Sequence, residues 1–457
     1  MAFQMRPYQA EAVDKIVSYF QDDKNKKNLA LVAPTAAGKS IIIAESVVRM
    51  QIRIVVFAPN KELVAQNFEK YSAYGYLNAG IFCAGLGLKE IKQVTFATIM
   101  SAKNCPERFM GFDYAIIDEC DLVKPETGSM YLDFMQKVGI KKCLGLTATP
   151  IRNYPTQMGT EVRIIWRTRP KFFDDVLYHV PVKTMVENNW WAHLQYVEYD
   201  FDESSLRLKS NGLNYTEDSI KKAMEANDTL ELMKKHIFNL KGGRSALVFC
   251  SSTQVARELH AFFPNSACVT DKTKPADREY FVDNFRKGKI KLMFNYSVFS
   301  VGFDYSDLDC IFIQRPTNSI RWYQQVIGRL VRVPDIDKVK YVIDYCNNVK
   351  RFGYVENIDI RKHNVGKSQK YSLFNNNVLL SNTPLDEIGS KWLGDDGYIK
   401  VKKRTHSSYT RTIHFGEHSG KPLAKVPMNY LKWCGTKSWC PQYIRDEISA
   451  RASRSKR

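Results

Sequence analysis

The stretch APTAAGKS, residues 33–40, has the residue types of a phosphate-binding loop. In such a loop, successive backbone N–H groups point at phosphate oxygens, and the following helix adds the positive end of its dipole. Lys39 would reach the β- and γ-phosphates, and the Ser40 hydroxyl would ligate Mg²⁺. Ala33 replaces the usual first glycine, a mild change because this position mainly turns the chain out of a strand. The expected nucleotide contacts are Pro34, Thr35, Ala36, Ala37, Gly38, Lys39 and Ser40.

Two adjacent carboxylates, Asp118 and Glu119, end the apolar run YAIIDE. At the end of a strand, Asp118 would bind Mg²⁺ and Glu119 would polarise the water that attacks the γ-phosphate. An acidic pair alone is more often a solvated turn, but its place downstream of a phosphate loop favours the catalytic interpretation. The sequence therefore predicts ATP and Mg²⁺ as cofactors.

A third group of candidates lies in QVIGRLVR, residues 325–332, which we expect on a helix. Arg329 and Arg332 are three residues apart and would share one helix face. Two cations from a second domain could stabilise the charge that develops as the γ-phosphate is transferred. A solvated basic helix face is the alternative that these residues alone leave open.

The elements that must position these residues alternate along the chain. Apolar β-rich runs and amphipathic helical patterns alternate in the first 150 residues and again from about Ser245 to Cys346, which favours parallel sheets covered on both faces. Ligands bind at the carboxyl ends of strands in such sheets, and the polar clusters fall there. The sequence predicts an α/β protein with domains at 1–153 and 154–352 and a basic module at 353–457.

Strands are expected within residues 28–34, 53–60, 79–84, 93–98, 114–119 and 141–149 of the first domain, and within residues 245–252, 267–270, 291–296, 310–314 and 340–346 of the second.

Charge indicates a polyanionic partner. The 457 residues carry a formal net charge of +19, and residues 351–457 hold 20 Lys or Arg against 9 Asp or Glu. Such a balance favours nucleic acid over a membrane, and no apolar run approaches the ~18 residues of a membrane span. The N-terminus lacks the apolar core of a signal peptide, and the ten cysteines form no CxxC pair, so we expect a cytoplasmic protein with reduced thiols.

In this order, the motifs resemble those of a superfamily-two helicase over roughly residues 3–350. The resemblance implies two tandem RecA-like domains that close on ATP and step along one strand, with the family's usual 3′ to 5′ bias. It places Arg6 and Gln9 at the adenine, Thr147 and Thr149 of TATP in the coupling of hydrolysis to movement, and Gln325, Arg329 and Arg332 in motif VI. By the same resemblance, Gly302 and Asp304 of motif V contact the nucleotide, and Pro59, Asn60, Lys61, Thr98, Ser251 and Ser252 contact nucleic acid.

The variants APNKELVAQ, TATP and RPYQ resemble the DNA-directed branch of this superfamily, which contains repair helicases, restriction-enzyme motor subunits and phage UvsW-type enzymes. The compact chain favours a phage branch-migration or recombination helicase, acting on forked or junction DNA as a monomer. Asn295–Ser297 departs from the motif V pattern and puts one phosphate contact in doubt. A duplex translocase, an RNA helicase and an ATP-gated junction clamp are the alternatives.

Near the C-terminus, FGEHSGKPL (residues 415–423) and the YLKW that follows resemble a small module of phage and bacterial nucleases and helicases. We expect DNA contacts from Lys402, Lys403 and Arg404, which offer phosphate-binding charge. Cys434 and Cys440 stand near three histidines, but their spacing fits no standard finger, so no zinc is expected.

Overall fold

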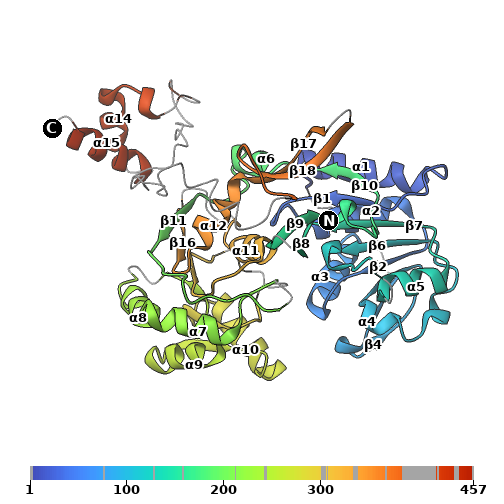
Figure 1. The fold of residues 1–457 in the computed structure, drawn as a ribbon. Coiled ribbons are helices and arrows are strands. Elements are labelled where there is room, and N and C mark those ends of the chain that lie inside the picture. The colour runs from blue at the N-terminus through green and yellow to red at the C-terminus, as the bar shows by residue number, and fades with distance from the viewer. Residues whose placement is uncertain are drawn as a thin grey trace.

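The computed structural model describes residues 4–75, 78–126, 129–156, 159–210, 213–240, 244–299, 305, 307–332, 338–365, 368–382, 418, 421, 423–436 and 442–454. Two α/β domains lie side by side, and a pair of helices follows near the C-terminus (Figure 1). Across these ranges, no helix is both long and apolar enough to cross a bilayer.

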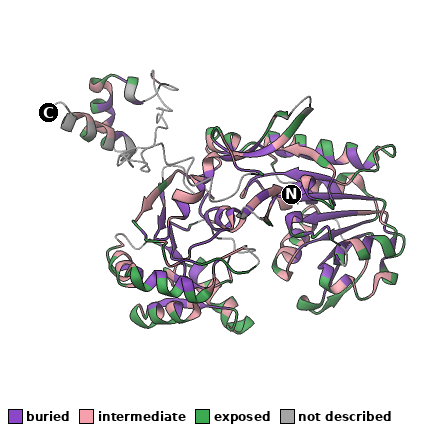
Figure 2. Cartoon of the chain, viewed as in Figure 1, coloured by how far each residue is buried: buried purple, intermediate pink, exposed green. Residues whose placement is uncertain are grey.

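The first domain is built on an eight-stranded sheet with the order β10-β1-β7-β6-β2-β5-β3-β4. Its strand pairs are parallel except β3–β4. Every residue of β1, β2, β3, β5 and β7 is buried, as in a sheet covered by helices on both faces (Figure 2). The expected α/β class is confirmed, and each of the six expected strands is present.

The elements of this domain are β1 Leu29–Val32, β2 Ile54–Phe57, β3 Ala79–Cys83, β4 Leu88–Lys89, β5 Val94–Ala97, β6 Tyr114–Asp118, β7 Lys142–Thr147 and β10 Asp175–His179, with helices α1 Pro7–Gln21, α2 Lys39–Met50, α3 Lys61–Ser72, α4 Ile99–Ala102 and α5 Met130–Val138.

Strand β10 extends the first sheet beyond residue 153, where the sequence placed the domain boundary. It pairs in parallel with β1, and the ladder is continued by Val180 N–H donating to the Val32 carbonyl at 2.9 Å. Its residues are exposed or half-buried, because it is an edge strand. The sequence DVLYH therefore lacks the continuous apolar run by which the other strands were recognised.

The second domain has a six-stranded sheet with the order β11-β16-β15-β12-β14-β13, in which every pair is parallel. The five expected strands are present, and β11 was not expected. The elements are β11 Leu194–Glu198, β12 Ala246–Phe249, β13 Ser266–Val269, β14 Leu292–Asn295, β15 Cys310–Ile313 and β16 Lys340–Asp344, with α7 Glu217–Ala226, α8 Thr229–Phe238, α9 Thr253–Phe262, α10 Pro275–Arg286, α11 Ile320–Ile327 and α12 Asn348–Phe352.

The two domains share an apolar core. One cluster of buried side chains runs from Leu31 in β1 through Trp191 to Leu247 and Ile327 in the second domain. The opposite face of the second sheet packs in a cluster of its own, which includes Val248. The interface between the domains is therefore packed, and it brings α11 close to the end of β1.

Two hairpins and helix α6, Val182–Glu187, lie at this interface. They are β8 Ile151–Thr156 with β9 Gly159–Ile164, and β17 Ile358–Val365 with β18 Ser368–Asn375, to which β19 Val378–Leu379 is added. Asp359 of β17 accepts hydrogen bonds from the backbone N–H of Val182 at 2.9 Å and lies 2.7 Å from His179 Nε2. Asn382 N–H donates to the Val162 carbonyl at 2.7 Å. Residues up to Asn382 thus pack on the first domain, beyond the expected module boundary at 353.

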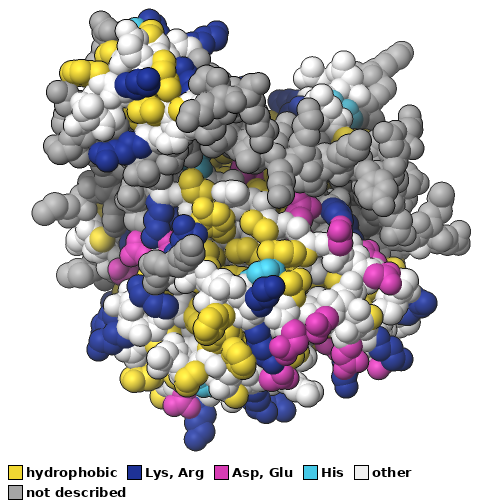
Figure 3. Space-filling model, turned by 90° about the vertical axis from the view of Figure 1, so that its left-hand side faces the viewer, with side chains coloured by type: hydrophobic (Ala, Val, Ile, Leu, Met, Phe, Trp, Pro, Cys, Tyr) yellow, Lys and Arg dark blue, Asp and Glu magenta, His cyan; other side chains and the backbone are white. Residues whose placement is uncertain are grey.

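The last two described helices, α14 Met428–Gly435 and α15 Gln442–Arg454, form a hairpin with a small core of its own. That core contains Leu423, Val426, Leu431, Cys434 and Ile444. On the face of the molecule formed by this hairpin and the second domain, exposed apolar side chains lie among Lys and Arg (Figure 3).

Candidate nucleotide and coupling site

The loop between β1 and α2 shows how Ala33 is accommodated in place of the usual first glycine. Ala33 is buried, and its N–H donates to the Thr147 carbonyl at 3.0 Å, so it continues the β1–β7 ladder. Its φ is not positive; the left-handed residues of the loop are Ala36 (φ 61°) and Gly38 (φ 74°). A side chain on Gly38 would also lie 2.5 Å from Gln9 Nε2. The glycine that this loop requires is therefore Gly38.

The first turn of α1 and its N-cap residue Arg6 support the loop. Tyr8 Oη and Gln9 Nε2 each donate to the Ala37 carbonyl at 2.9 Å, and Gln9 Oε1 accepts from Arg6 N–H at 2.8 Å. Gln9 is buried with both ends of its amide engaged within the protein. Gln9 thus holds the loop, while the half-buried Arg6 packs its guanidinium 4.8 Å from the ring centre of Trp190. Adenine contact by Arg6 and Gln9 stays a prediction.

The loop lysine meets the two carboxylates at the end of β6. Lys39 Nζ lies 3.3 Å from Glu119 Oε1, and both side chains are largely buried. Asp118 accepts hydrogen bonds from Asn67 Nδ2 at 3.1 Å and from Glu119 N–H at 3.0 Å. Burial and the nearby Glu119 charge raise the pKa of Asp118 to about 6, against the opposing effect of Lys39.

This group of residues fits a nucleotide phosphate and a hard cation. Glu119 Oε2 is buried and accepts no hydrogen bond from the described residues. The hydroxyl and carboxylate oxygens of Ser40, Asp118 and Glu119 are the donors that Mg²⁺ prefers. Lys39 and the N-terminus of α2 supply positive charge for phosphate oxygens.

A hydrogen-bonded chain leads from the carboxylates to the second domain. Thr149 N–H donates to Thr147 Oγ1 at 3.0 Å, and Thr147 Oγ1 donates to Asp121 Oδ1 at 2.7 Å. The other oxygen of Asp121 accepts from Nε of Arg321 on α11. Burial raises the pKa of Asp121, while the Arg321 charge opposes this rise. Thr147 and Thr149 thus belong to this chain of hydrogen bonds, and their part in coupling stays a prediction.

Arg321 and Asn67 were not predicted from the sequence, because neither lies in a motif and both meet their carboxylates only in the folded structure. Asp121 had a local signal as the last residue of DECD.

Of the segment 325–332 that was expected on a helix, Gln325–Ile327 lie on α11, but Arg329 and Arg332 lie beyond its end, so the expectation of a shared helix face was wrong. Helix α11 ends at Ile327, and Arg329 and Leu330 N–H groups then donate to carbonyls three residues back, which tightens the chain into turns. At this end, Gly328 packs on the phosphate loop: a Cβ there would lie 2.6 Å from Thr35 Oγ1. Arg329 and Arg332 therefore follow a point of direct contact with the loop.

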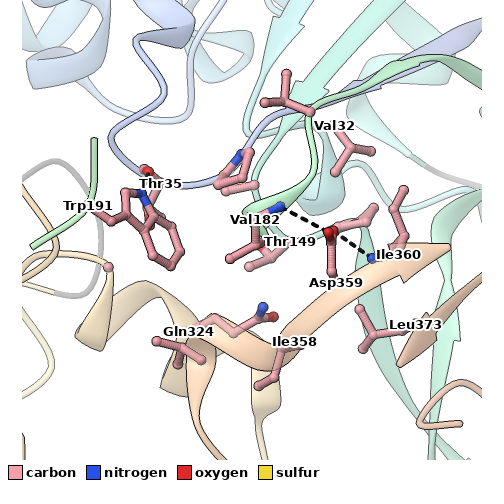
Figure 4. A pocket seen from close by; sticks show the side chains of 16 residues that line it. Val32, Thr35, Thr149, Val182, Trp191, Gln324, Ile358, Asp359, Ile360 and Leu373 are labelled. Carbon is pink, nitrogen blue, oxygen red and sulfur yellow. Dashed lines mark hydrogen bonds between the residues drawn. The ribbon is translucent and has the colours of Figure 1, made fainter. Parts of the chain in front are cut away.

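A small cavity of about 30 Å³ lies at this contact (Figure 4). Its lining includes Thr35, Trp191 of the interdomain linker and Gln324 of α11. Gln325, the expected motif VI glutamine, is buried and is not among the residues that line this cavity. Its part in motif VI stays a prediction.

The expected nucleic-acid contacts have local partners. Asn60 and Ser252 cap α3 and α9, accepting from Leu63 N–H at 2.9 Å and Val255 N–H at 3.1 Å. Thr98 is buried with its hydroxyl 2.9 Å from Ser101 Oγ, and Ser251 is buried beside Gln314.

Two of these contacts lie beside each other near the domain interface. Pro59 is half-buried, and Lys61 Nζ lies 3.8 Å from Glu279 of the second domain. Other residues named from the sequence lie outside the described residues: Gly302 and Asp304, expected at the nucleotide, Lys402, Lys403 and Arg404, expected at DNA, and Cys440.

Residues 2–152 match the family "Type III restriction enzyme, res subunit", and residues 228–334 match the "Helicase conserved C-terminal domain". The chain thus carries the two conserved domains of a superfamily-two helicase. The two matches contain the phosphate loop, the carboxylates and the arginine segment in the order that the sequence predicted, so the resemblance to this superfamily is confirmed.

Several proteins share this organisation. The chain is 24% identical to the putative mitochondrial ATP-dependent helicase irc3 of Schizosaccharomyces pombe, over 77% of its own length and 58% of that protein. It is 25% identical to a 51.5 kDa protein of a Lactococcus phage, over 69% of the chain and 65% of that protein. It is 24% identical to the DNA 3′-5′ translocase XPB2 of Sulfurisphaera tokodaii, over 73% of the chain and 79% of that protein. The chain thus spans less than two thirds of the length of the first two relatives.

Two solved structures share the fold. A fragment of a putative HsdR subunit of a type I restriction enzyme from Vibrio vulnificus is 18% identical, with a TM-score of 0.57 over 77% of this chain and 67% of that structure's chain. The type ISP restriction-modification enzyme LlaBIII bound to DNA is 13% identical, with a TM-score of 0.57 over 76% of this chain and 28% of that structure's chain. This likeness supports the two RecA-like domains.

Proposed function

We propose that this helicase is a DNA-directed motor that hydrolyses Mg²⁺-ATP and steps along one strand of forked or junction DNA. Lys39 and the loop N–H groups bind the phosphates, Ser40 and Asp118 hold Mg²⁺, and Glu119 orients and polarises the attacking water. Arg329 and Arg332 come from the second domain to stabilise the charge of the transition state. When bound, Mg²⁺ neutralises phosphate charge in the site.

The observation that carries this proposal is the contact of Gly328 with Thr35. It places the residues before both arginines on the phosphate loop of the other domain. The Asp121–Arg321 pair spans the same interface beside the carboxylates. A site completed by two domains can convert the loss of the γ-phosphate into domain movement, because its contacts differ before and after hydrolysis.

DNA is the proposed track because of the charge of the chain and the character of its relatives. The net charge of +19 favours a polyanion. Among the relatives is a protein named as a DNA 3′-5′ translocase, and one of the solved structures is bound to DNA. These names also favour a second candidate, a motor that moves along duplex DNA without separating its strands.

The C-terminal part from residue 383 onwards is proposed to hold the duplex or junction while the motor moves. Its helical hairpin exposes Lys425, Lys432 and about half of the Trp433 side chain. Cations bind phosphates and exposed aromatic rings stack on bases, which is typical of binding that tolerates different sequences. Lys402, Lys403 and Arg404 are assigned to the same role.

The test is to compare ATP hydrolysis and strand separation on single strands, duplex, forks, four-way junctions and RNA. We expect stimulation by DNA and strand separation on forks or junctions, both lost in Lys39→Ala. Stimulation by duplex with no strand separation would favour the translocase. Stimulation by RNA alone would overturn the DNA assignment.

A further inference from the structure

We propose that the interdomain linker Trp190–His193 and the buried Lys340 fix the arginine segment 329–332 against the phosphate loop, with Trp191 and Lys340 as positioning residues for ATP hydrolysis. This inference rests on the proposed function, because it assigns the arginines to the transition state.

The linker is tied to the phosphate loop by Trp191. Its indole Nε1 donates to the Thr35 carbonyl at 2.9 Å, and the ring is buried between the loop and α11 (Figure 4). The preceding Trp190 packs against Tyr8, with 5.0 Å between ring centres. The N–H groups of both tryptophans donate to the Met185 carbonyl, at 2.8 and 3.1 Å, so α6 fixes the linker in turn.

The same linker is tied to the arginine segment. Ala192 N–H donates at 2.8 Å to the carbonyl of Val331, which lies between the two arginines. His193 accepts from Lys340 N–H at 2.9 Å, and Lys340 Nζ donates to the Arg332 carbonyl at 2.5 Å. The linker therefore contacts the phosphate loop through the Trp191 side chain and the arginine segment through the Ala192 backbone.

Lys340 is an unusual residue for its place. It is the first residue of β16, a central strand, and its exposed fraction is 0%. Burial lowers its pKa to about 8; Lys338 and Arg332 add to this effect, and Asp309 and Asp307 oppose it. An apolar residue would fill the site without the cost of burying an ammonium group, but it could not hold the Arg332 carbonyl.

Position matters here because the arginines act on a transition state. A displacement of about 1 Å in a catalytic group can reduce a rate roughly a hundredfold. Trp191, Ala192 and Lys340 together are called the bracket. The bracket limits such displacement, since it joins the arginine segment to the phosphate loop through the linker Trp190–His193. Contacts made only within the second domain would let the arginines move with every small rotation between the domains.

The chain offers matched controls. Lys142 is also a buried lysine at the start of a strand, and its Nζ donates to the carbonyls of Tyr19 and Asp22 at 2.9 and 2.7 Å, away from the arginines. Trp166 is a buried tryptophan that packs on Tyr371. Lys142→Met and Trp166→Phe therefore remove the same kinds of group at sites outside the bracket.

The experiment measures ATP hydrolysis and nucleotide binding by the full chain in Trp191→Phe, Lys340→Met and the two controls. We expect kcat to fall roughly ten- to a hundredfold in the bracket variants, with nucleotide affinity within about twofold and control kcat within about twofold of wild type. In an Arg332→Ala background, Lys340→Met should lower kcat little further, because both changes remove the same function, the action of a correctly placed Arg332 side chain.

Equal losses with and without Arg332, or wild-type kcat in Trp191→Phe, would overturn the inference. If Lys340→Met does not fold, Trp191→Phe alone still decides the outcome, since phenylalanine keeps the ring and loses only the N–H. Wild-type protein that hydrolyses no ATP would instead reject the proposed function.

Discussion

Arg321 of the second domain donates to the buried carboxylate of Asp121, two residues beyond the proposed catalytic Glu119 of the first domain. The same carboxylate accepts from Thr147, whose hydroxyl also accepts from Thr149 N–H. A largely buried ion pair therefore joins the two domains next to the site where hydrolysis is proposed to occur. This pair connects α11 of the second domain to the carboxylate segment of the first.

Arg321→Met should uncouple the domains. It leaves Asp121 buried without its cation, which costs about 3–5 kcal/mol in the closed arrangement, so opening is favoured. We expect kcat for ATP hydrolysis to fall roughly a hundredfold, as for other misplaced catalytic groups. Arg321→Lys keeps the charge and should retain more activity. Steady-state hydrolysis checks both, and equal activity of wild type and Arg321→Met would show that the pair is not used.

Gly328→Ala should hold the domains apart. The added Cβ would lie 2.6 Å from Thr35 Oγ1, closer than atoms pack, although the φ of −57° at this position suits any residue. We expect at least about a tenfold fall in kcat with little change in nucleotide affinity, measured by hydrolysis and by equilibrium binding. Adding Thr35→Gly removes the clashing atoms and should restore part of the activity. Unchanged hydrolysis by Gly328→Ala would mean that this contact is not part of the working cycle.

Metal binding should weaken in mild acid. The pKa of Asp118 is about 6 in the folded protein, against 3.8 for the ordinary group. Between these values the folded state holds the extra proton, so its stability without nucleotide declines as pH rises from about 4 to 6. Mg²⁺ needs the carboxylate, so its stabilisation of the nucleotide complex should appear as pH rises through about 6.

Thermal unfolding midpoints with and without Mg²⁺-ATP, at pH 5.5 and 7.5, measure this effect. Asp118→Asn should show little Mg²⁺ stabilisation at either pH. An equal Mg²⁺ shift at both pH values in wild type would contradict the assignment of Asp118.

Truncation after Asn382 should separate the motor from the C-terminal module. Leu380 is buried, and Ser381 and Asn382 bond to residues 373 and 162, so a cut before them would damage the motor. We expect basal ATP hydrolysis to stay within about twofold, while affinity for forked DNA falls and its salt dependence weakens because fewer phosphates are contacted. An equal loss of basal ATP hydrolysis and of affinity for forked DNA would assign the module a purely structural role.

The sequence predicted the features that depend on neighbouring residues. Buried strands such as β2 and β7 are continuous apolar runs, and Lys39 and Asp118 lie in motifs whose spacing is local. Features that depend on distant contacts were missed. Strand β10 is half-polar and pairs with β1 only at an edge. Arg321 and Trp191 find their partners across the domain interface, and Lys340 meets the Arg332 carbonyl only in the folded second domain.

Packing changed one expectation. Helix α11 ends at Ile327, and the next residue packs against Thr35, a contact that a helical pattern cannot show. The hydroxyls of Thr98 and Ser251 are bonded to Ser101 and Gln314, and the contact of both residues with nucleic acid stays a prediction.

The central claim is that Lys39, Asp118 and Glu119 form a site that hydrolyses ATP when the chain engages DNA. Its most direct test compares wild type with Glu119→Gln in ATP binding and in hydrolysis on forked DNA. We predict that the variant binds ATP as wild type does and hydrolyses it at least about a hundredfold more slowly, since it lacks the group that polarises water. Wild-type hydrolysis by Glu119→Gln would contradict the account.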